Sequence, residues 1–381
     1  METPQAQSYT AKQLGVTSKP QKSPTGLYAK GACLLDASSG RVLFEKNADT
    51  QMPMASTTKI MTCILTLEST KLDDTVTFSS HAASMPDVQI NAVAGESFLL
   101  KDLLYSLMLE SHNDTAVAIA EHVGGSVEDF ASMMNKKAEE LGLTNTHFVT
   151  PNGLDAKEHY TTPKELCLIA AYAMQNDTFR KIITTKEHSF SSSNKHRSFH
   201  VTNHDAFLTS YDGAIGIKTG FTGNAGYCFC GAAKRGDTLL ISSVLAAGWP
   251  PNKSYKWRDT RKLMDYGFAN FTNIEIPSGA RLPSITVKGG RNTTLPLKRS
   301  KPLKELTLPL SADDTVAIRY ELPTVVTAPV RNGDVIGYEN YYLGDMLIQS
   351  IPIASDREIK EVDPLYMGRL LSRLFFLKAI S

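Results

Sequence analysis

The sequence of 381 residues lacks any apolar run long enough to cross a membrane, because no stretch reaches the ~20 residues that a spanning helix needs. It also lacks an excess of either charge: 40 Lys and Arg stand against 39 Asp and Glu, which gives a net charge of +1. Proteins that bind nucleic acid usually carry a basic excess. We therefore expect no nucleic-acid partner, and nothing indicates a strongly acidic one.

Cysteine is scarce, and the five that occur are scattered: Cys33, Cys63, Cys167, Cys228 and Cys230. An odd number at such spacings does not form a disulfide framework. Cys228 and Cys230 have no second Cys or His pair at metal-ligand spacing nearby. We expect the cysteines to be small buried hydrophobic residues, and we expect neither a metal nor a cofactor.

The N-terminal segment is polar and rich in Gln, Lys, Ser and Pro from Met1 to Ala29. It lacks the apolar central region of a signal peptide, and taken alone this indicates a cytosolic protein. Residues 1–26 are predicted to be a flexible lead-in.

The rest of the chain is long enough for two globular units. In residues 27–272, a predicted hairpin around Ser38-Ser39-Gly40 opens the unit, and strands return after residue 190. Helical spacing predicts helices between them, over 54–69, 99–109, 114–123, 127–141 and 163–174, and strands over 198–202, 226–233 and 238–245, before a last helix over 258–271. We expect strands from both ends of this unit to share one sheet, with the helices packed on its faces.

Residues 273–362 contain short, evenly spaced apolar runs divided by Gly, Pro, Asn and Asp, which predicts a small all-β sandwich. Residues 363–381 predict an amphipathic helix with a broad apolar face. Such a helix could lie on a membrane surface, with Arg369, Arg373 and Lys378 near the lipid head groups. The alternative is a terminal helix docked on its own protein or on a partner chain.

Three short motifs occur in order along the first unit: Ser56-Thr57-Thr58-Lys59, Ser111-His112-Asn113 and Lys218-Thr219-Gly220. Each is weak alone, and a second Ser-x-x-Lys, Ser192 to Lys195, lies in a polar run that predicts a turn or an exposed connection between strands. Only the first copy is followed by an apolar helical pattern.

Ser56 and Lys59 would stand one turn apart on the same helix face. A hydroxyl at a helix N-terminus lies near the positive end of the helix dipole, and a buried lysine with a lowered pKa can accept its proton. Ser56 and Lys59 are therefore a candidate nucleophile and base. The competing interpretation is that Ser56 only caps the helix.

The other two motifs supply polar groups for the same cleft. Ser111 would relay a proton between Lys59 and a leaving nitrogen, and Asn113 could hydrogen-bond a substrate amide. Lys218 and Thr219 offer a cation and a hydroxyl to a carboxylate, and Gly220 allows close approach of the backbone. The backbone N–H groups of Ser56 and Phe221 could form an oxyanion hole.

Ser-x-x-Lys, Ser-x-Asn and Lys-Thr-Gly in this order resemble the signature of penicillin-binding proteins and serine β-lactamases. The flanking residues Met54 to Thr62, Pro151-Asn152-Gly153-Leu154, His159 to Thr162 and Gly216 to Thr222 are similar to those of the low-molecular-mass D-alanyl-D-alanine carboxypeptidases. The resemblance runs from about Leu27 to the C-terminus, because that family also carries a β-rich second domain and a terminal amphipathic anchor. It implies that the first unit is an α/β-type transpeptidase/β-lactamase-like domain, with an antiparallel sheet and helices on both faces.

The resemblance implies Ser56 as nucleophile, Lys59 as general base, and Lys218 with Thr219 as the site for a terminal carboxylate. An arginine that often helps to hold that carboxylate corresponds to Lys256 here, with Arg258 and Arg261 close by. The middle of the second motif, usually a small residue, is His112. Its side chain could narrow or polarise the cleft, or it could face solvent without a role.

The implied substrate is a peptidoglycan stem peptide ending in D-Ala-D-Ala, with β-lactam antibiotics as covalent inhibitors. The implied location is the outer face of the bacterial cytoplasmic membrane, from which it would follow that an export signal has been removed. Two alternatives remain: a β-lactam sensor or wall-binding protein that acylates without turnover, and a serine β-lactamase. The sequence has no Glu-x-x-Leu-Asn loop of the kind that a class A β-lactamase uses for deacylation.

Overall fold

The computed structural model describes residues 5–17, 20–301 and 306–378, with the side chains of the last helix described up to Arg373. The chain divides into two compact units. The larger comprises residues 21–270, and the smaller combines the residues up to 20 with those from 271 onward. All residues of the three motifs lie in the larger unit.

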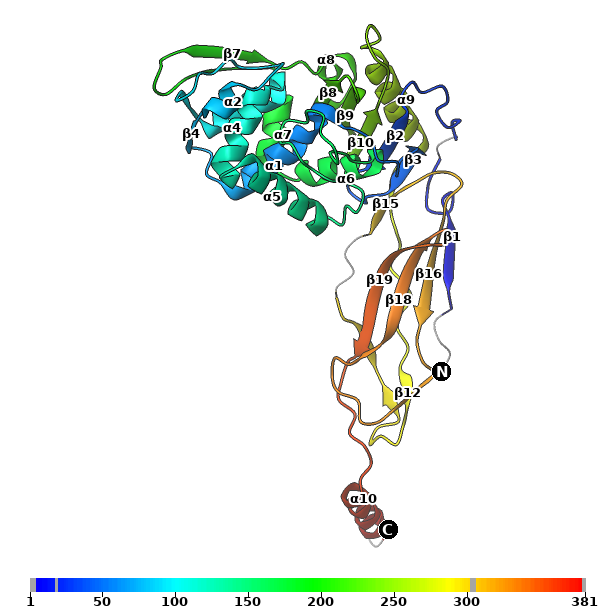
Figure 1. Cartoon of the computed structure of the whole chain (residues 1–381). Helices are drawn as coiled ribbons and strands as arrows, with labels where there is room; N and C mark the ends of the chain where they lie inside the picture. The colour runs from blue at the N-terminus through cyan, green and yellow to red at the C-terminus, as the bar shows by residue number, and fades with distance from the viewer. Residues whose placement is uncertain (1–4, 18–19, 302–305, 379–381) are drawn as a thin grey trace. The chain divides into compact units, whose positions relative to one another are not determined.

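A five-stranded antiparallel sheet forms the frame of the larger unit (Figure 1). Its order is β3 (Val42–Lys46), β2 (Gly31–Asp36), β10 (Thr238–Leu245), β9 (Gly226–Arg235) and β8 (Ala214–Thr222). The predicted union of strands from both ends of the unit is confirmed, because β2 pairs with β10. The predicted hairpin is also confirmed, as β2 and β3.

Helices cover both faces of this sheet, as predicted. The thiol of Cys33 on β2 lies against Cys167 of α6 (Pro163–Ala173). The next residue, Leu34, lies against Gly267 of α9 (Tyr255–Asn270). Because successive side chains on a strand point to opposite faces, α6 and α9 pack on opposite sides. All five cysteines are buried and unpaired, as expected.

The remaining elements lie between β3 and β8 in the chain. The predicted helices are confirmed to within a few residues. The helical elements are η1 (Ala55–Thr58), α1 (Lys59–Ser69), α2 (Ser80–Ala83), α3 (Leu100–Tyr105), η2 (Ser106–Glu110), α4 (Asn113–Gly124), α5 (Val127–Glu140), α7 (Asp177–Thr184) and α8 (Phe207–Ser210). Two short hairpins are β4 (Thr75–Thr77) with β5 (Ser97–Leu99), and β6 (Glu187–Ser191) with β7 (Ser198–Thr202).

Helix α1 runs through the core of this unit. Every residue from Lys59 to Thr66 is buried, and α1 packs against α4, α5 and α6. A helix buried on all sides gives a fixed platform, because close-packed interiors leave little room for displacement. The polar Ser192–Lys195 run forms the predicted turn, between β6 and β7.

Strand β8 differs from the sequence-based expectation. Lys218-Thr219-Gly220 was expected to precede a strand that starts near Gly226, whereas the motif lies inside β8, which pairs with β9 over its whole length. Gly216, Lys218 and Gly220 interrupt the apolar pattern, so alternation alone did not indicate this strand.

The smaller unit is rich in β-structure, as predicted. Its main sheet has the order β1 (Gln7–Thr10), β16 (Thr315–Glu321), β18 (Val335–Leu343), β19 (Met346–Ser355) and β14 (Leu297–Arg299). Smaller sheets join β11 (Thr272–Glu275) with β15 (Thr307–Leu310), and β12 (Ile285–Lys288) with β13 (Thr294–Leu295) and β17 (Val325–Thr327).

The expected flexible lead-in over residues 1–26 differs from the structure where the structure describes it. Residues 7–10 form β1, which pairs antiparallel with β16. Ala11 and Val16 are buried in the core of the smaller unit. A polar N-terminal segment therefore becomes ordered by pairing with a strand that is distant in the sequence.

The predicted terminal helix is α10 (Pro364–Lys378). Leu365 and Leu371 are more than half exposed. Leu374, Phe375, Leu377 and Lys378 contribute to the predicted amphipathic pattern, but their side chains lie outside the described set. Within the described residues, no helix is both long enough and apolar enough to span a membrane.

Candidate active site

The first motif forms the turn that leads into α1. Lys59 Nζ lies 3.0 Å from Ser56 Oγ, as the spacing of one helical turn allows. The residue capping η1 is Met54, and the one capping α1 is Thr58. Ser56 therefore caps neither helix, and the interpretation that it is only a cap is wrong.

Lys59 is fully buried and is surrounded by oxygen atoms. Besides Ser56, its ammonium group donates to Asn113 Oδ1 at 2.8 Å and to the Asn152 carbonyl at 2.6 Å. Burial lowers the pKa of Lys59 well below its usual value, and the positive charge of Lys218 lowers it further. A buried lysine whose pKa is lowered in this way gives up its proton more readily, and the neutral amine can then accept a proton from a hydroxyl group.

The second motif sits where η2 ends and α4 begins. Ser111 has a φ of 73°, in the left-handed region that few non-glycine residues adopt. Its Oγ is buried and has no hydrogen-bond partner among the described residues. Asn113 is engaged at both ends, since its Nδ2 donates to the Pro86 carbonyl at 3.1 Å. A strained serine with an unsatisfied hydroxyl is typical of a functional site.

His112 is buried, so the interpretation that it faces solvent is wrong. Its Nδ1 lies 2.8 Å from Ser106 Oγ, and its Nε2 lies 3.2 Å from a Glu110 carboxylate oxygen. Burial lowers the pKa of His112 to about 4. A neutral imidazole with both nitrogens engaged fixes the loop on which Ser111 and Asn113 stand.

The third motif lies on β8, at the edge of the sheet. Lys218 is buried, and burial lowers its pKa to about 7. A side chain at Gly220 would place its Cβ 3.0 Å from the Ser56 backbone nitrogen, so only glycine lets β8 approach the first motif this closely. An edge strand offers backbone groups to an extended peptide.

A cavity of about 430 Å³ opens beside these motifs. Ser56, Asn113 and Phe221, each predicted as a site residue, line it. Of the other lining residues, Gly153, Leu154 and Thr222 belong to the flanking motifs, whereas no sequence pattern indicated Asp87, Val88, Asp155 and Gly223. Five separate segments of the chain thus converge on one concave surface.

The residue in the arginine position is also buried. Lys256 on α9 lies with its Nζ 4.8 Å from the centre of the Tyr227 ring, and Tyr227 packs against Phe221 of β8. The neighbouring arginines contact other residues: the Arg258 guanidinium lies over Tyr28, and that of Arg261 reaches the Ser210 hydroxyl. Among these three basic residues, Lys256 is the one that packs next to the β8–β9 pair.

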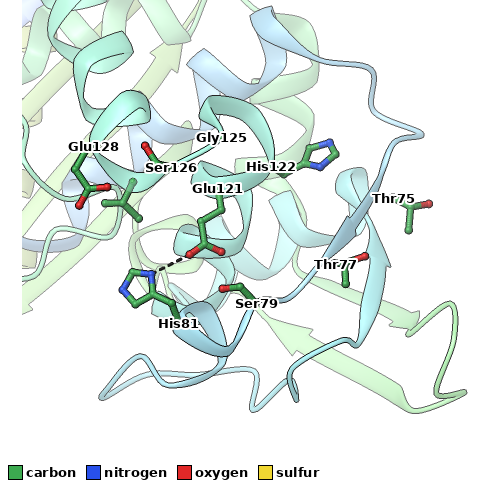
Figure 2. A pocket seen from close by; sticks show the side chains of 10 residues that line it. Thr75, Thr77, Ser79, His81, Glu121, His122, Gly125, Ser126 and Glu128 are labelled. Atoms are coloured by element: carbon green, nitrogen blue, oxygen red, sulfur yellow. Dashed lines mark hydrogen bonds and ion pairs between the residues drawn. The ribbon is translucent and has the colours of Figure 1, made fainter.

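A second and larger cavity, of about 570 Å³, lies between β4, α2 and the turn from α4 to α5 (Figure 2). It contains none of the predicted site residues. Its serines are engaged in capping, because Ser79 accepts from Ala82 N–H and Ser126 accepts from Asp129 N–H. His81 pairs with Glu121 at 2.9 Å. Ser79 and Ser126 thus have no arrangement like that of Ser56 with Lys59.

Comparison with known proteins relates both parts of the chain to one group of enzymes. Residues 17–248 match the D-alanyl-D-alanine carboxypeptidase family, and residues 276–361 match the C-terminal domain of penicillin-binding protein 5. The chain is 31% identical to D-alanyl-D-alanine carboxypeptidase DacF of Bacillus subtilis, over 87% of this chain and 86% of the relative. It is 36% identical to the D-alanyl-D-alanine carboxypeptidase of Streptomyces sp. K15, over 67% of this chain and 92% of that one.

The solved structures agree with this relationship. Penicillin-binding protein 5 of Haemophilus influenzae superposes with a TM-score of 0.72 at 27% identity, over 90% of this chain and all of that one. The fold is therefore that of the penicillin-binding proteins, with an antiparallel sheet, helices on both faces and a β-rich second domain. The family match, the relatives and the fold together place this chain in the D-alanyl-D-alanine carboxypeptidase family of serine peptidases.

Proposed function

We propose that the protein removes the terminal D-alanine from peptidoglycan stem peptides that end in D-Ala-D-Ala, through an acyl-enzyme on Ser56. The observation that carries this proposal is the 3.0 Å contact between Ser56 Oγ and the buried amine of Lys59, at the edge of a cavity. Nucleophile and base stand within hydrogen-bond reach of each other, as acyl transfer requires.

In this mechanism the terminal carboxylate of the substrate lies against Lys218 and Thr219. Neutral Lys59 takes the proton of Ser56, whose Oγ attacks the penultimate carbonyl carbon. The backbone N–H groups of Ser56 and Phe221 stabilise the oxyanion, at about 3 kcal/mol for each donor in other enzymes. The C–N bond then breaks, and Ser111 passes a proton to the amine of the departing D-alanine.

Water completes the cycle. It attacks the ester on Ser56, the acyl group leaves as a shortened peptide acid, and the serine proton is restored. A β-lactam follows the same first step, but its leaving nitrogen stays attached to the acyl group, which then obstructs the water. Asn113 supports both steps, because its carbonyl oxygen holds Lys59 beside Ser56.

The direct test uses a diacetyl-Lys-D-Ala-D-Ala peptide and measures the release of D-alanine over many turnovers. Steady release supports the carboxypeptidase. Labelling by penicillin without peptide turnover would favour a β-lactam sensor, and rapid release of hydrolysed penicillin would favour a β-lactamase. Ser56→Ala should abolish both peptide hydrolysis and covalent labelling, and labelling that persists by intact mass would overturn the assignment of the nucleophile.

The location proposed for this activity is outside the cytoplasmic membrane, where the peptidoglycan substrate lies, with residues 364–381 on the membrane surface. The support is the exposed apolar side chains of α10, of which Leu365 is 69% and Leu371 is 61% exposed, together with Arg369 and Arg373 on the same helix. Deleting residues 364–381 should abolish sedimentation with anionic vesicles and leave peptide hydrolysis intact. Vesicle binding by the truncated protein would contradict the anchor.

A further inference from the structure

Asp205 is a buried carboxyl group that the mechanism above does not use. It lies in the segment before α8 and is 5% exposed. Its Oδ1 accepts the Phe207 N–H at 2.9 Å, which is a local cap for the start of α8. Its Oδ2 is buried and has no hydrogen-bond partner among the described residues. Capping of α8 accounts for Oδ1 but not for Oδ2. A buried carboxylate oxygen without a hydrogen bond destabilises the folded state, so its presence needs another explanation.

The unexplained oxygen faces the strand that carries the third motif. A Cβ placed on Gly216 of β8 would lie 3.6 Å from Asp205 Oδ2. Gly216 and Lys218 are two residues apart on the same strand, so their side-chain positions share one face of the sheet. Asp205 therefore lies beside the face of β8 from which Lys218 projects.

The titratable groups around Asp205 come from three further elements. Lys218 on β8 and Lys256 on α9 both interact with its charge. Cys230 on β9 is a neutral thiol, because burial raises its pKa well above the usual value. Around Lys218 itself, the other charged or titratable neighbours are Lys59 and His112. Around Lys256, they are Lys253 and Cys228.

We propose that Asp205 is a positioning residue that keeps Lys218 and Lys256 charged together, so that they can hold the terminal carboxylate of the substrate. This inference rests on the proposed function. Two buried lysines repel each other, and each disfavours the charge on the other. The one carboxylate and the two ammonium groups that interact with it carry a net charge of +1, which a single substrate carboxylate neutralises.

The electrostatics of the three groups support this arrangement. Burial lowers the pKa of Lys218 to about 7 and that of Lys256 to about 8, whereas the charge of Asp205 acts to raise both. Burial raises the pKa of Asp205 to about 7, and the two lysines act to lower it. Without the carboxylate, Lys218 would lose its proton at a lower pH, and a smaller share of the sites would carry its charge at pH 7 to 8.

The test compares Asp205→Asn with the wild type. Asparagine keeps the size of the side chain and an oxygen that can accept the Phe207 N–H. The control is Asp212→Asn, which removes an aspartate that is 92% exposed. Two substrates with the same acyl group are needed: the free acid diacetyl-Lys-D-Ala-D-Ala, and a neutral activated ester of diacetyl-Lys-D-Ala, whose leaving group keeps acylation measurable without a carboxylate.

For the free acid, Asp205→Asn should raise KM roughly tenfold at pH 8, because a smaller share of Lys218 is then protonated, and less at pH 6. For the neutral ester, kcat/KM should stay within twofold of the wild type, and the control should match the wild type on both substrates. An unchanged KM, or an equal loss on both substrates at every pH, would overturn the role of Asp205.

Two further measurements keep the inference testable. Asp205→Glu retains the charge and should move the pH profile back toward that of the wild type. If the asparagine variant does not fold, Asp205→Ser replaces it, because a serine hydroxyl is neutral and can also accept the Phe207 N–H. A KM of the serine variant for the free acid that equals the wild-type value at pH 8 overturns the inference. A wild type that releases no D-alanine contradicts the proposed function instead.

Discussion

Lys59→Arg tests the general base at the centre of the proposed mechanism. The guanidinium group is always protonated, so it cannot accept the Ser56 proton at any working pH. It nevertheless keeps a positive charge that can donate to the oxygens which Lys59 now contacts, at Asn113 and Asn152. The substitution therefore removes the base and leaves a cation in its place.

The expected magnitude follows from the geometry of this contact. A base placed within hydrogen-bond reach contributes about 10²- to 10⁴-fold to the rate, and Lys59 Nζ is 3.0 Å from Ser56 Oγ. We expect the rate of acylation by penicillin to fall about 10³-fold, which corresponds to about 4 kcal/mol in the activation free energy. A larger head group in a fully buried position also costs about 1–3 kcal/mol of stability.

The assay is the rate of labelling by a fluorescent penicillin, measured at several penicillin concentrations, beside a thermal melt that establishes how much variant is folded. Lys101→Arg is the matched control, because Lys101 lies on the surface in an ion pair with Asp73, and its labelling rate should equal that of the wild type. If Lys59→Arg is folded and acylates within tenfold of the wild type, Lys59 is not the base.

Three other predictions follow from buried contacts. Gly220→Ala should lower kcat/KM about 100-fold, because its Cβ meets the Ser56 backbone nitrogen and must displace β8; an unchanged kcat/KM would show that this approach is not required. The kcat/KM of the free acid should fall as pH rises through about 7, where Lys218 loses its proton, and Lys218→Arg should shift that fall to higher pH; a fall at the same pH would assign it to another group. Burial lowers the pKa of His159 from its ordinary value of 6.5 to about 4. Between pH 6.5 and pH 4 the unfolded chain therefore binds more protons at His159 than the folded chain does, and the folded state loses stability as pH falls. Protonation of His159 should lower the unfolding free energy by about 3 kcal/mol between pH 6.5 and pH 4. In His159→Gln, chemical denaturation should show a smaller drop over the same pH range, and a drop equal to that of the wild type would exclude His159 as its source.

Elements with a clear local pattern were predictable from the sequence. Strand β10 has the predicted bounds, because Thr238 to Leu245 is an apolar run between turn residues. Helix α5 matches because its apolar residues recur at helical spacing and Ser126 caps it. Strand β1 was missed, since Gln7–Thr10 is short and polar and is ordered only by its pairing with β16. Local patterns carry no information on such distant partners.

The residues of the candidate site also differ in whether a local sequence pattern indicates them. Motif order and spacing indicated Ser56 and Lys59, because one turn of helix brings them together. The carbonyl of Asn152, which holds Lys59, could not be identified, because any residue type supplies that atom and only the fold aims it. Asp205 was missed for a related reason: an isolated aspartate in a loop is ordinary until burial and the nearby lysines give it a role.

The pairing of β1 with β16 has a consequence for the order in which the chain can fold. Gln7 leaves the ribosome long before Ile318, its partner in the register, and the whole 21–270 unit is synthesised in between. The N-terminal strand β1 therefore stays unpaired until β16 has been synthesised, by which time the 21–270 unit can already fold. Closing so long a loop is slow, so the β-rich unit should be the last part of the protein to become resistant to proteases after synthesis.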